Sequence, residues 1–439
     1  MVTFISLFLW LMTDVHQVQV SVDLSVASVE IILDGQSVGT ATAPRWAVGC
    51  DFGETPRPHE LIAVAYDDDG IETGRARQLV NLPRADAEVE ILFEGANPGA
   101  PEQLRVITES SERLEPLAVS VIFDGQVLQS SGDGRFPLPA HDRGLVHIIS
   151  AEAYFPGGIS ARSDVTFGGA YGSRVATDLT AVPIVSERRD RLDADQLQGL
   201  FRVRGEPVHA AAVEQPGARV YLVRDHGAWP SISQIGYAID RRLNQGHYRR
   251  FLRNEAIEAM ATAAELTPEK DRYYLVVPNP DRERGLALFP IIGPLGIKSR
   301  WMMPWLATHI SSPEAGLPGQ RLGEAVAVAA VRAAGGGAPR AVVLVLSENP
   351  VDDSHYQPSA VQEYLRALRV PLVVWSTADD GAADGWGGAT IISDQASLTK
   401  ASNRLLKELE RQWIVWVEGR HLPSDIELDP EVQGIRLAG

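Results

Sequence analysis

Apolar and polar residues alternate in short runs over the first part of the chain, a period of two that is typical of half-buried β-strands. VEIILDGQSV (29–38) and VSVIFDGQVL (119–128) show it most clearly, and in each segment an Asp-Gly pair separates two alternating runs. Both residues of such a pair tolerate positive φ, so each segment is predicted to form a β-hairpin. No apolar spacing of helical period and length occurs before about residue 190.

The two hairpin segments belong to a longer internal repeat. HELIAVAYDDDGIETGRARQLVN (59–81) is similar to VHIISAEAYFPGGISARSDVTFG (146–168), at nearly the offset that separates the hairpins. A near-constant offset over two segments indicates duplicated domains. Residues 18–94 and 95–186 are therefore predicted to form two β-sandwich modules of immunoglobulin-like size. Cys50 is the single cysteine, so no intrachain disulfide is possible, and we interpret it as a small core residue.

An apolar run of nine residues, FISLFLWLM (4–12), stands at the N-terminus. A membrane span needs about 20 residues, so the run fits the apolar region of a secretory signal better. Residues 1–17 are predicted to be a signal peptide or apolar leader, and the protein is expected in the periplasm, at the cell surface or outside the cell. Because no Lys or Arg precedes the run and no small-x-small cleavage site follows it, a retained anchor and a truncated start stay open.

The pattern changes after a charged linker, SERRDRLDAD (186–195). RVYLVRD (219–225) and RAVVLVLSEN (340–349) are continuous apolar runs, which are typical of strands buried on both faces. RLGEAVAVAAVRAA (321–334) has helical spacing and ends at a run of glycines. Strands that alternate with helices predict a parallel, doubly wound α/β sheet over residues 187–439.

Net charge narrows the range of partners. The chain carries a formal charge of −17, which opposes binding to nucleic acid or anionic lipid through bulk electrostatics. No apolar stretch is long enough for an integral membrane span, although association with a membrane-bound complex is compatible with the sequence. We therefore expect a protein partner.

Four segments of the second half resemble the bacterial VWFA-related domain, a von Willebrand factor A-like (VWA-like) α/β fold. They are LQGLFRVRGEPVHAAAVE (197–214), RVYLVRD, AGLPGQRLGEAVAVAAV (315–331) with RAVVLVLSEN, and LRALRVPLVVWST with LLKELERQWIVWV (405–417). The resemblance implies a doubly wound VWA-like domain with a lead-in hairpin. Members of this family often carry β-sandwich modules and a secretion signal, which agrees with the first half of this chain.

The resemblance also implies a place for a divalent metal, where the family has Asp-x-Ser-x-Ser directly after the first strand. Asp225 occupies the Asp position, but Gly227 and Trp229 replace the two serines. Mg²⁺ prefers about six oxygen ligands in near-octahedral geometry, and neither replacement supplies a side-chain oxygen. Trp229, a large aromatic in the place of a small hydroxyl, is predicted to cover this rim or contact a partner.

The other two metal-binding loops of the family also depart from its pattern here. The position of the family's Thr falls near Gln320, and its third-loop Asp is replaced around Ser347, Glu348 and Asn349. We expect a degenerate site that needs no cofactor. The alternative is a weak Mg²⁺ or Mn²⁺ site in which Asp225 and Glu348 are the surviving ligands.

Catalytic motifs are missing from the sequence: it has no Gly-x-Ser-x-Gly, His-Glu-x-x-His or Gly-x-x-x-x-Gly-Lys segment. The best alternative polar cluster is Asp352, Asp353 and His355, after a core strand at the carboxyl edge where open α/β sheets bind ligands. It would suit a hydrolase, although a solvated loop is the simpler interpretation.

An unusual apolar patch, WMMPWL (301–306), contains two Trp and two Met around a proline. Such residues are enriched at protein interfaces, so its large side chains are predicted to bind a partner; they are Trp301, Met302, Met303 and Trp305. Packing of an insertion onto the sheet is the alternative. The function expected from the sequence is a non-catalytic protein-interaction or scaffold component of an exported envelope or extracellular assembly. A metal-dependent adhesion module is the second hypothesis and a hydrolase the third.

Overall fold

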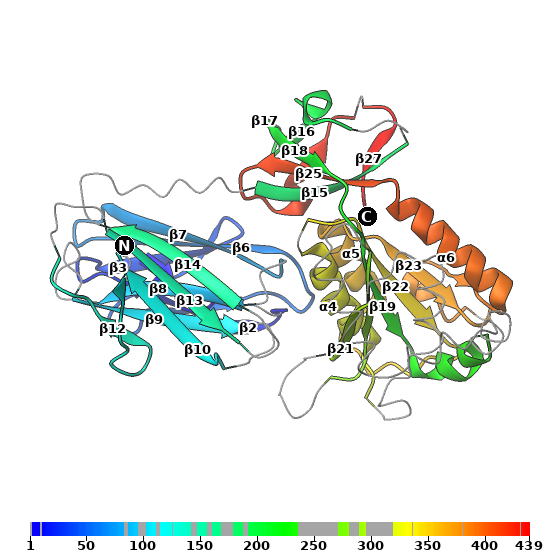
Figure 1. Ribbon diagram of the computed structural model, residues 1–439, viewed down its shortest axis with the longest axis horizontal. Helices are drawn as coiled ribbons and strands as arrows, with labels where there is room; N and C mark the ends of the chain where they lie inside the picture. The colour runs from blue at the N-terminus through cyan, green and yellow to red at the C-terminus, as the bar shows by residue number, and fades with distance from the viewer. Residues whose placement is uncertain are drawn as a thin grey trace. The chain divides into compact units, whose positions relative to one another are not determined.

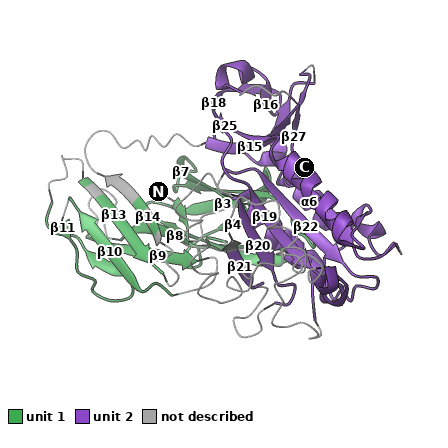
Figure 2. Cartoon of the chain, turned by 45° about the vertical axis from the view of Figure 1, so that its right-hand side comes forward, with its two compact units in different colours: residues 1–177 green, residues 178–439 purple. Residues whose placement is uncertain are grey.

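The chain forms two compact units, residues 1–177 and 178–439 (Figure 1; Figure 2). The computed structural model describes residues 2–8, 11–82, 87–94, 102–110, 115–124, 126–141, 147–155, 160–167, 179–187, 192–235, 271–280, 289–295, 319–335, 337–379, 381–430 and 432–439. The first unit is built from β-strands, and the second combines a mixed α/β sheet with two smaller sheets.

Residues 2–80 form the first β-sandwich module, with one sheet of three strands and one of four. The three-stranded sheet contains β1 (Val2–Phe4), β2 (Val15–Val22) and β5 (Ala47–Asp51), in that order. The other contains, in spatial order, β4 (Gln36–Ala41), β3 (Ser28–Leu33), β6 (His59–Tyr66) and β7 (Glu72–Val80). Alternate residues of both sheets point inward, and those fully buried in the core include Val18, Val29, Ile31, Cys50, Leu61 and Ala63.

The second module repeats this arrangement. Its three-stranded sheet contains β12 (Arg135–Pro137), β9 (Gln103–Ser110) and β8 (Ala87–Glu94). Its four-stranded sheet contains β11 (Gln126–Val127), β10 (Ala118–Phe123), β13 (His147–Tyr154) and β14 (Ser160–Phe167). Val29 pairs with Ala65 in the first module as Val119 pairs with Ala153 in the second. The predicted duplication and the two β-sandwich modules are confirmed.

The hairpin turn of the first module has the backbone conformation that the Asp-Gly signal predicts, and Asp124 of the second module agrees with it. Asp34 and Gly35 have φ values of 50° and 80°, and Asp124 in the second module has a φ of 45°. Positive φ at both central residues gives a turn whose twist matches that of the flanking strands. Cys50 is buried in the first core, as expected, and burial raises the pKa of its thiol to about 11.

The apolar N-terminal run differs from the predicted leader. β1 pairs with β2, and Phe4, Leu7 and Met12 are buried in the first module. The Asn81 side chain accepts a hydrogen bond from the Met12 backbone N–H (2.6 Å) and donates one to the Met12 carbonyl (2.7 Å). The boundary at residue 17 is therefore corrected, because β1 and the buried residues Phe4, Leu7 and Met12 belong to the first module.

The other two boundaries of the β-sandwich modules also shift. β8 pairs with β9 along its whole length, so residues 87–94 belong to the second module and not to the first. β15 (Leu179–Ser186) lies between β25 (Gln412–Glu418) and β27 (Ile435–Leu437), which places it in the second unit. The α/β unit thus includes residues that the sequence assigned to the module before it.

A six-stranded sheet organises the second unit. In spatial order its strands are β21 (Ile291–Leu295), β20 (Arg272–Val276), β19 (Arg219–Arg224), β22 (Arg340–Leu346), β23 (Leu372–Ser376) and β24 (Thr390–Ile391). Five of them are parallel, but β21 runs antiparallel to β20, because the chain turns back and pairs Ile291 with Val276. The prediction of an all-parallel sheet is wrong at this edge.

Helices cover both faces of the sheet (Figure 1). α4 (Leu322–Ala334) and α5 (Pro358–Ala367) lie on one face, and α6 (Gln395–Leu409) lies on the other. Every residue of β22 is buried, as its continuous apolar sequence predicts. None of the helices in the described part of the chain combines the length and the apolar composition that crossing a bilayer requires.

Two small sheets complete the second unit. One contains β18 (Ala210–Glu214), β25, β15 and β27; the other contains β17 (Glu206–Val208), β16 (Phe201–Val203) and β26 (Ile426–Leu428). The predicted lead-in hairpin is confirmed as β16 and β17, with Gly205 at the turn. β25, which contains the end of the LLKELERQWIVWV segment, is an inner strand of the first small sheet. Short 3-10 helices span Ala194–Leu197, His226–Ala228, Asp384–Trp386 and Pro423–Asp425.

Candidate functional site

The candidate site lies where the strand order of the α/β sheet reverses. β19 comes first in the chain, β20 is added on one side of it and β22 on the other. Ligands of doubly wound sheets bind at such a switch point, outside the carboxyl ends of the strands. Asp225 directly follows β19, Ser347 directly follows β22, and Gln320 precedes α4, so these three side chains meet at that point.

Asp225 is buried, with 1% of its surface exposed, and donors surround its carboxylate. Oδ1 accepts hydrogen bonds from the Gly227 backbone N–H (3.0 Å) and from the Gln320 amide Nε2 (2.6 Å). Oδ2 accepts from the Ser347 backbone N–H (3.0 Å) and from the Ser347 hydroxyl. A carboxylate offers about four lone-pair positions. Four donors therefore satisfy this buried charge, and a cation would have to displace one of them.

The Gln320 side chain extends this network to a third strand end. Its amide also donates to the Val351 carbonyl, and its Oε1 accepts from the His226 backbone N–H (3.1 Å). The His226 ring in turn hydrogen-bonds the side chain of Asn279, which is buried beyond the end of β20. The sequence placed Gln320 on the second loop of the site, but neither its contact with Asp225 nor the role of Asn279 was predicted.

Gly227 is required by the close approach of Ser347. A Cβ atom at residue 227 would lie 2.6 Å from Ser347 Oγ and 3.2 Å from Asp225 Oδ2. Real Cβ atoms do not approach other atoms at the first of these distances, so a serine at residue 227 would displace Ser347. Ser347 thus occupies space that is available only because residue 227 is a glycine.

Trp229 is half-buried and covers a buried cation. The Arg224 guanidinium carbon lies 4.3 Å from the centroid of the Trp229 ring, which is a cation–π contact. Arg224 is 3% exposed, and burial lowers its pKa to about 10. One of the two predicted roles of Trp229, covering the rim, fits this placement. Partner binding by Trp229 stays a prediction.

Glu348, the other predicted metal ligand, is not brought together with Asp225. Glu348 follows Ser347 and is exposed, and no hydrogen bond or ion pair described for this part of the chain joins it to Asp225. The predicted apolar binding patch, Trp301, Met302, Met303 and Trp305, lies outside the described residues.

The polar loop at 352–355, which suited a hydrolase, caps a helix. Asp352 Oδ1 accepts from the Leu322 backbone N–H (2.9 Å), at the first turn of α4. The Ser354 hydroxyl accepts from the Gly323 N–H (2.7 Å), and Glu324 accepts from the His355 N–H (2.9 Å). The first N–H groups of a helix have no partners within the helix, so this loop satisfies them. The Asp352 carboxylate and the Ser354 hydroxyl thus serve the structure, while Asp353 and His355 are exposed.

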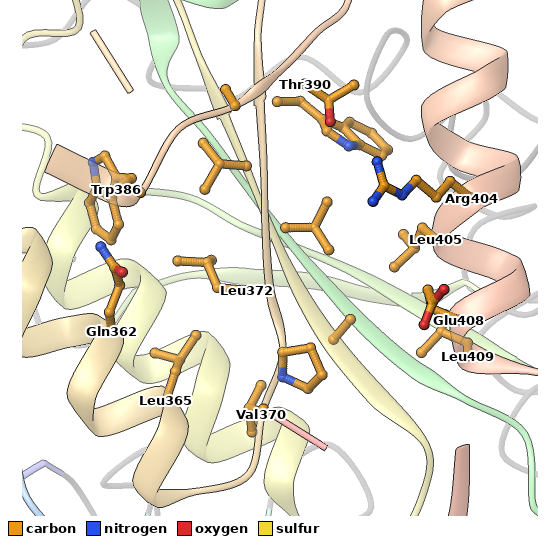
Figure 3. Close-up of a pocket in the computed structure, with 18 of the residues that line it drawn as sticks. Gln362, Leu365, Val370, Leu372, Trp386, Thr390, Arg404, Leu405, Glu408 and Leu409 are labelled. Atoms are coloured by element: carbon orange, nitrogen blue, oxygen red, sulfur yellow. The ribbon is translucent and has the colours of Figure 1, made fainter. Parts of the chain in front are cut away.

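A groove of about 800 Å³ opens along β23, between α5 and α6 (Figure 3). Gln362 and Trp386 line one side, Arg404 and Leu405 line the other, and Leu372 lies between them. This groove was not predicted from the sequence. The signal available in the sequence was a pair of glycines at 387–388. They directly precede β24, which is only two residues long and therefore covers only part of the edge of β23.

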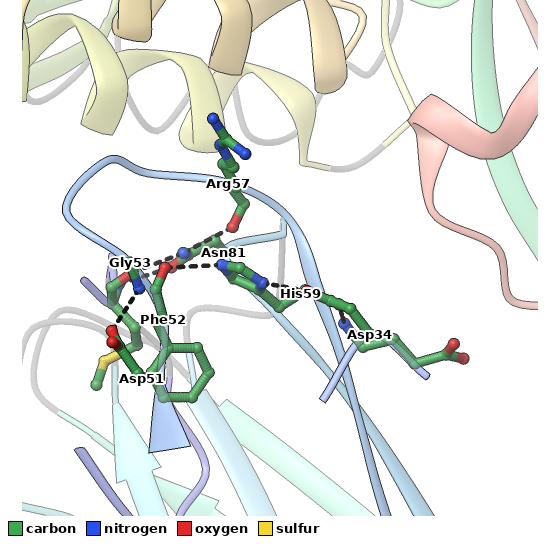
Figure 4. A network of polar contacts seen from close by, with 9 residues as sticks. Asp34, Asp51, Phe52, Gly53, Arg57, His59 and Asn81 are labelled. Carbon is green, nitrogen blue, oxygen red and sulfur yellow. Dashed lines mark hydrogen bonds and ion pairs between the residues drawn. The ribbon is translucent and has the colours of Figure 1, made fainter. Parts of the chain in front are cut away.

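Each β-sandwich module also holds a His–Asp pair. His59 Nδ1 lies 2.7 Å from Asp34 Oδ2, and its Nε2 lies 3.1 Å from the Phe52 carbonyl oxygen (Figure 4). His147 and Asp124 repeat the contact in the second module, at 2.6 Å. In both, the Asp of the hairpin turn is joined to the first residue of a neighbouring strand. The duplication of the pair with the module indicates a structural role.

No protein-family model and no curated protein matches the sequence. Among solved structures, the fibronectin(III)-like modules of Clostridium thermocellum CbhA are 17% identical; the match covers 18% of this chain and 93% of theirs, with a TM-score of 0.16. The central fibronectin-III array of RIM-binding protein is 9% identical over 43% of this chain and 78% of its own, with a TM-score of 0.19. The Bacteroides ovatus glucan-utilization protein SGBP-B is 13% identical over 47% and 57%, at 0.14. Likenesses at these scores carry no argument, and the β-sandwich assignment rests on the sheets themselves.

Proposed function

We propose that this protein is a non-catalytic interaction component whose VWA-like domain has replaced its metal site with an internal hydrogen-bond network. The observation that carries the proposal is the set of four donors on the buried carboxylate of Asp225. Three of them are N–H groups, which cannot ligate a cation. Partner binding would therefore proceed without a metal bridge.

The arrangement of the sheet supports the VWA-like assignment. Numbered from β19 along the chain, its strands lie in the order 3-2-1-4-5-6, a doubly wound order with the switch point beside the first strand. Asp225 follows that first strand, where the family resemblance expects the metal-binding Asp. The lead-in hairpin β16–β17 precedes it, also as the resemblance implies.

A non-catalytic role is supported by the hydrogen bonds that the polar side chains near Asp225 make within the fold. Asp352 and Ser354 are held in the cap of α4, and Asp225 is held by its donors. Tandem β-sandwich modules are common in cell-surface proteins, which supports a place in an envelope or extracellular assembly. A scaffold with several modules presents more than one surface to its partners.

Affinity purification of the tagged chain from its own cells tests this function. Membrane, periplasmic and extracellular fractions are purified in parallel with Mg²⁺ and with EDTA, and bound proteins are identified by mass spectrometry. We expect the same specific partners in both buffers, because no metal bridges the contact. The tag alone is the control.

Two results of that purification would count against the proposal. Partners that are recovered in Mg²⁺ and lost in EDTA would favour the metal-dependent adhesion module. A chain that retains no specific partner in any fraction would contradict an interaction function.

A further inference from the structure

One edge of the α/β sheet is only partly covered. β24 pairs with β23 at Trp375 and Ser376 alone, while β22 pairs with all of β23. Within the part of the chain that the structure describes, no strand lies beside residues 372–374 on the β24 side. An edge of this kind is a template for pairing with another strand.

The backbone of β23 directs free hydrogen-bonding groups to this open side. The Pro371 carbonyl accepts from the Val342 N–H (2.9 Å), so odd-numbered residues face β22. The Ser376 carbonyl accepts from the Ile392 N–H (2.8 Å), so even-numbered residues face β24. Because this alternation continues along a strand, Leu372 and Val374 turn their N–H groups toward the groove.

Apolar side chains form the walls of the groove on both sides of this edge (Figure 3). Leu365 of α5 and Trp386 line one wall, and Leu405 and Leu409 of α6 line the other. A strand added to a sheet alternates its side chains between the two faces, so each wall would receive every second side chain. The groove thus offers main-chain pairing and apolar contacts together, which is the combination used in strand addition.

The charged side chains that line the groove indicate which kind of added strand it would bind. Arg366, Arg404 and Arg436 line the groove with one acid, Glu408, and all three arginines are exposed. Glu408 already lies 3.6 Å from Arg436. The groove is therefore positive on a chain whose net charge is −17, and it complements an acidic segment.

We infer that the open edge of β23 binds an extended acidic segment of a partner protein as an added β-strand. This inference rests on the proposed interaction function and gives it a surface and a partner chemistry. The segment would hydrogen-bond the backbone at Leu372 and Val374. Its apolar side chains would contact Leu365 and Trp386 on one wall, and its acids, on the opposite face of the added strand, would pair with Arg404 on the other wall.

Peptide binding to the full chain tests the inference. The probe is a fluorescein-labelled peptide, EVTVEVE, followed by fluorescence anisotropy, and the charge control is KVTVKVK. We expect saturable binding of the acidic probe that weakens as salt rises, and at least about tenfold weaker binding of the basic one. Equal binding of the two peptides, or no binding of either, would overturn the inference.

Strand pairing itself is tested with two N-methylated forms of the acidic probe, each blocking alternate amides. Only one set of amides of an added strand faces the sheet, so one form should lose binding and the other should keep it. Equal loss with both forms would contradict strand addition.

Protein variants locate the site. Arg404→Glu is expected to weaken the acidic probe about tenfold, because it reverses a charge beside the added strand. Lys407→Glu reverses an exposed charge on the same helix outside the groove and should leave affinity within about twofold. Circular dichroism confirms that both variants fold. An equal effect of the two variants would show that the acidic probe does not bind in the groove.

The outcomes separate this inference from the proposed function. If purification recovers partners but the acidic probe does not bind, the groove assignment fails and the interaction function stands. If sedimentation shows a dimer that Arg404→Glu dissociates, the edge pairs with a second copy of this chain, and the partner assignment is overturned.

Discussion

At the scale of single residues, the buried carboxylate of Asp225 is stabilised by the Gln320 side-chain amide and by the space that Gly227 leaves for Ser347. Gln320 donates to Asp225 where a cation would otherwise balance the buried carboxylate. Gly227 leaves the space that Ser347 uses to reach the same carboxylate. A buried carboxylate is tolerated when it is hydrogen-bonded or paired, so these contacts stabilise the fold whatever the domain binds.

Gly227→Ser tests this packing, because it adds a side chain where Ser347 approaches the backbone of residue 227. The new Cβ would meet Ser347 Oγ at 2.6 Å, and we expect a loss of about 1–3 kcal/mol in the free energy of unfolding. Urea unfolding followed by tryptophan fluorescence measures it. In the Ser347→Ala background the hydroxyl is gone, so the same substitution should cost less. An additive pair of effects would contradict a direct clash between residues 227 and 347.

At the scale of elements, each β-sandwich module ties its hairpin turn to a neighbouring strand through a His–Asp pair. Burial raises the pKa of Asp34, but hydrogen bonds from His59 and from the Glu60 backbone N–H, with the charge on His59, outweigh burial. The pKa of Asp34 is therefore held below its ordinary value of 3.8. A lowered carboxyl pKa stabilises the fold above the ordinary value, and this contribution is lost as pH falls through the lowered one.

Asp34→Asn is expected to remove that pH-dependent contribution. At neutral pH the loss should be about 0.5–1 kcal/mol, kept small because solvent screens this half-exposed carboxylate. The difference from the wild type should shrink toward zero as pH falls through the lowered pKa. Denaturant unfolding at a series of pH values measures it, with the exposed Asp69→Asn as control. A difference that stays constant down to low pH would show that the ionised pair is not its source.

Individual turns and strands were predicted from the sequence more accurately than the sheet or domain to which each strand belongs. The Asp-Gly turn at Asp34 and the buried strand β22 follow from local conformation and continuous burial, which a short segment encodes. β8 and β15 keep the same local sequence whichever sheet they join, so only their strand pairing assigns them to a sheet. The Gln320–Asp225 contact joins residues far apart in the chain, and no local pattern signals it.

At the scale of the whole molecule, β15 decides where the second unit begins. It lies between β25 and β27, and its Val182 and Ile184 side chains are at most 1% exposed. Fragment 178–439 should fold, whereas fragment 187–439, cut at the boundary expected from sequence, lacks this strand. Burial of two such side chains is worth about 3–6 kcal/mol, a large part of a typical domain stability of about 5–15 kcal/mol.

Thermal unfolding of the two fragments by circular dichroism measures this difference. We expect a cooperative transition for 178–439, and a much lower or absent transition for 187–439. Equal transitions for both fragments would show that β15 is dispensable and would return the boundary to residue 186.

Calorimetric titration of Mg²⁺ and Mn²⁺ into the full chain and into Asp225→Ala tests whether the Asp225 carboxylate is satisfied without a metal. Because four donors occupy the carboxylate, we predict no saturable heat at this site, and therefore no difference between the two proteins. Saturable binding of either cation to the wild type, abolished in Asp225→Ala, would show that Asp225 is a metal ligand.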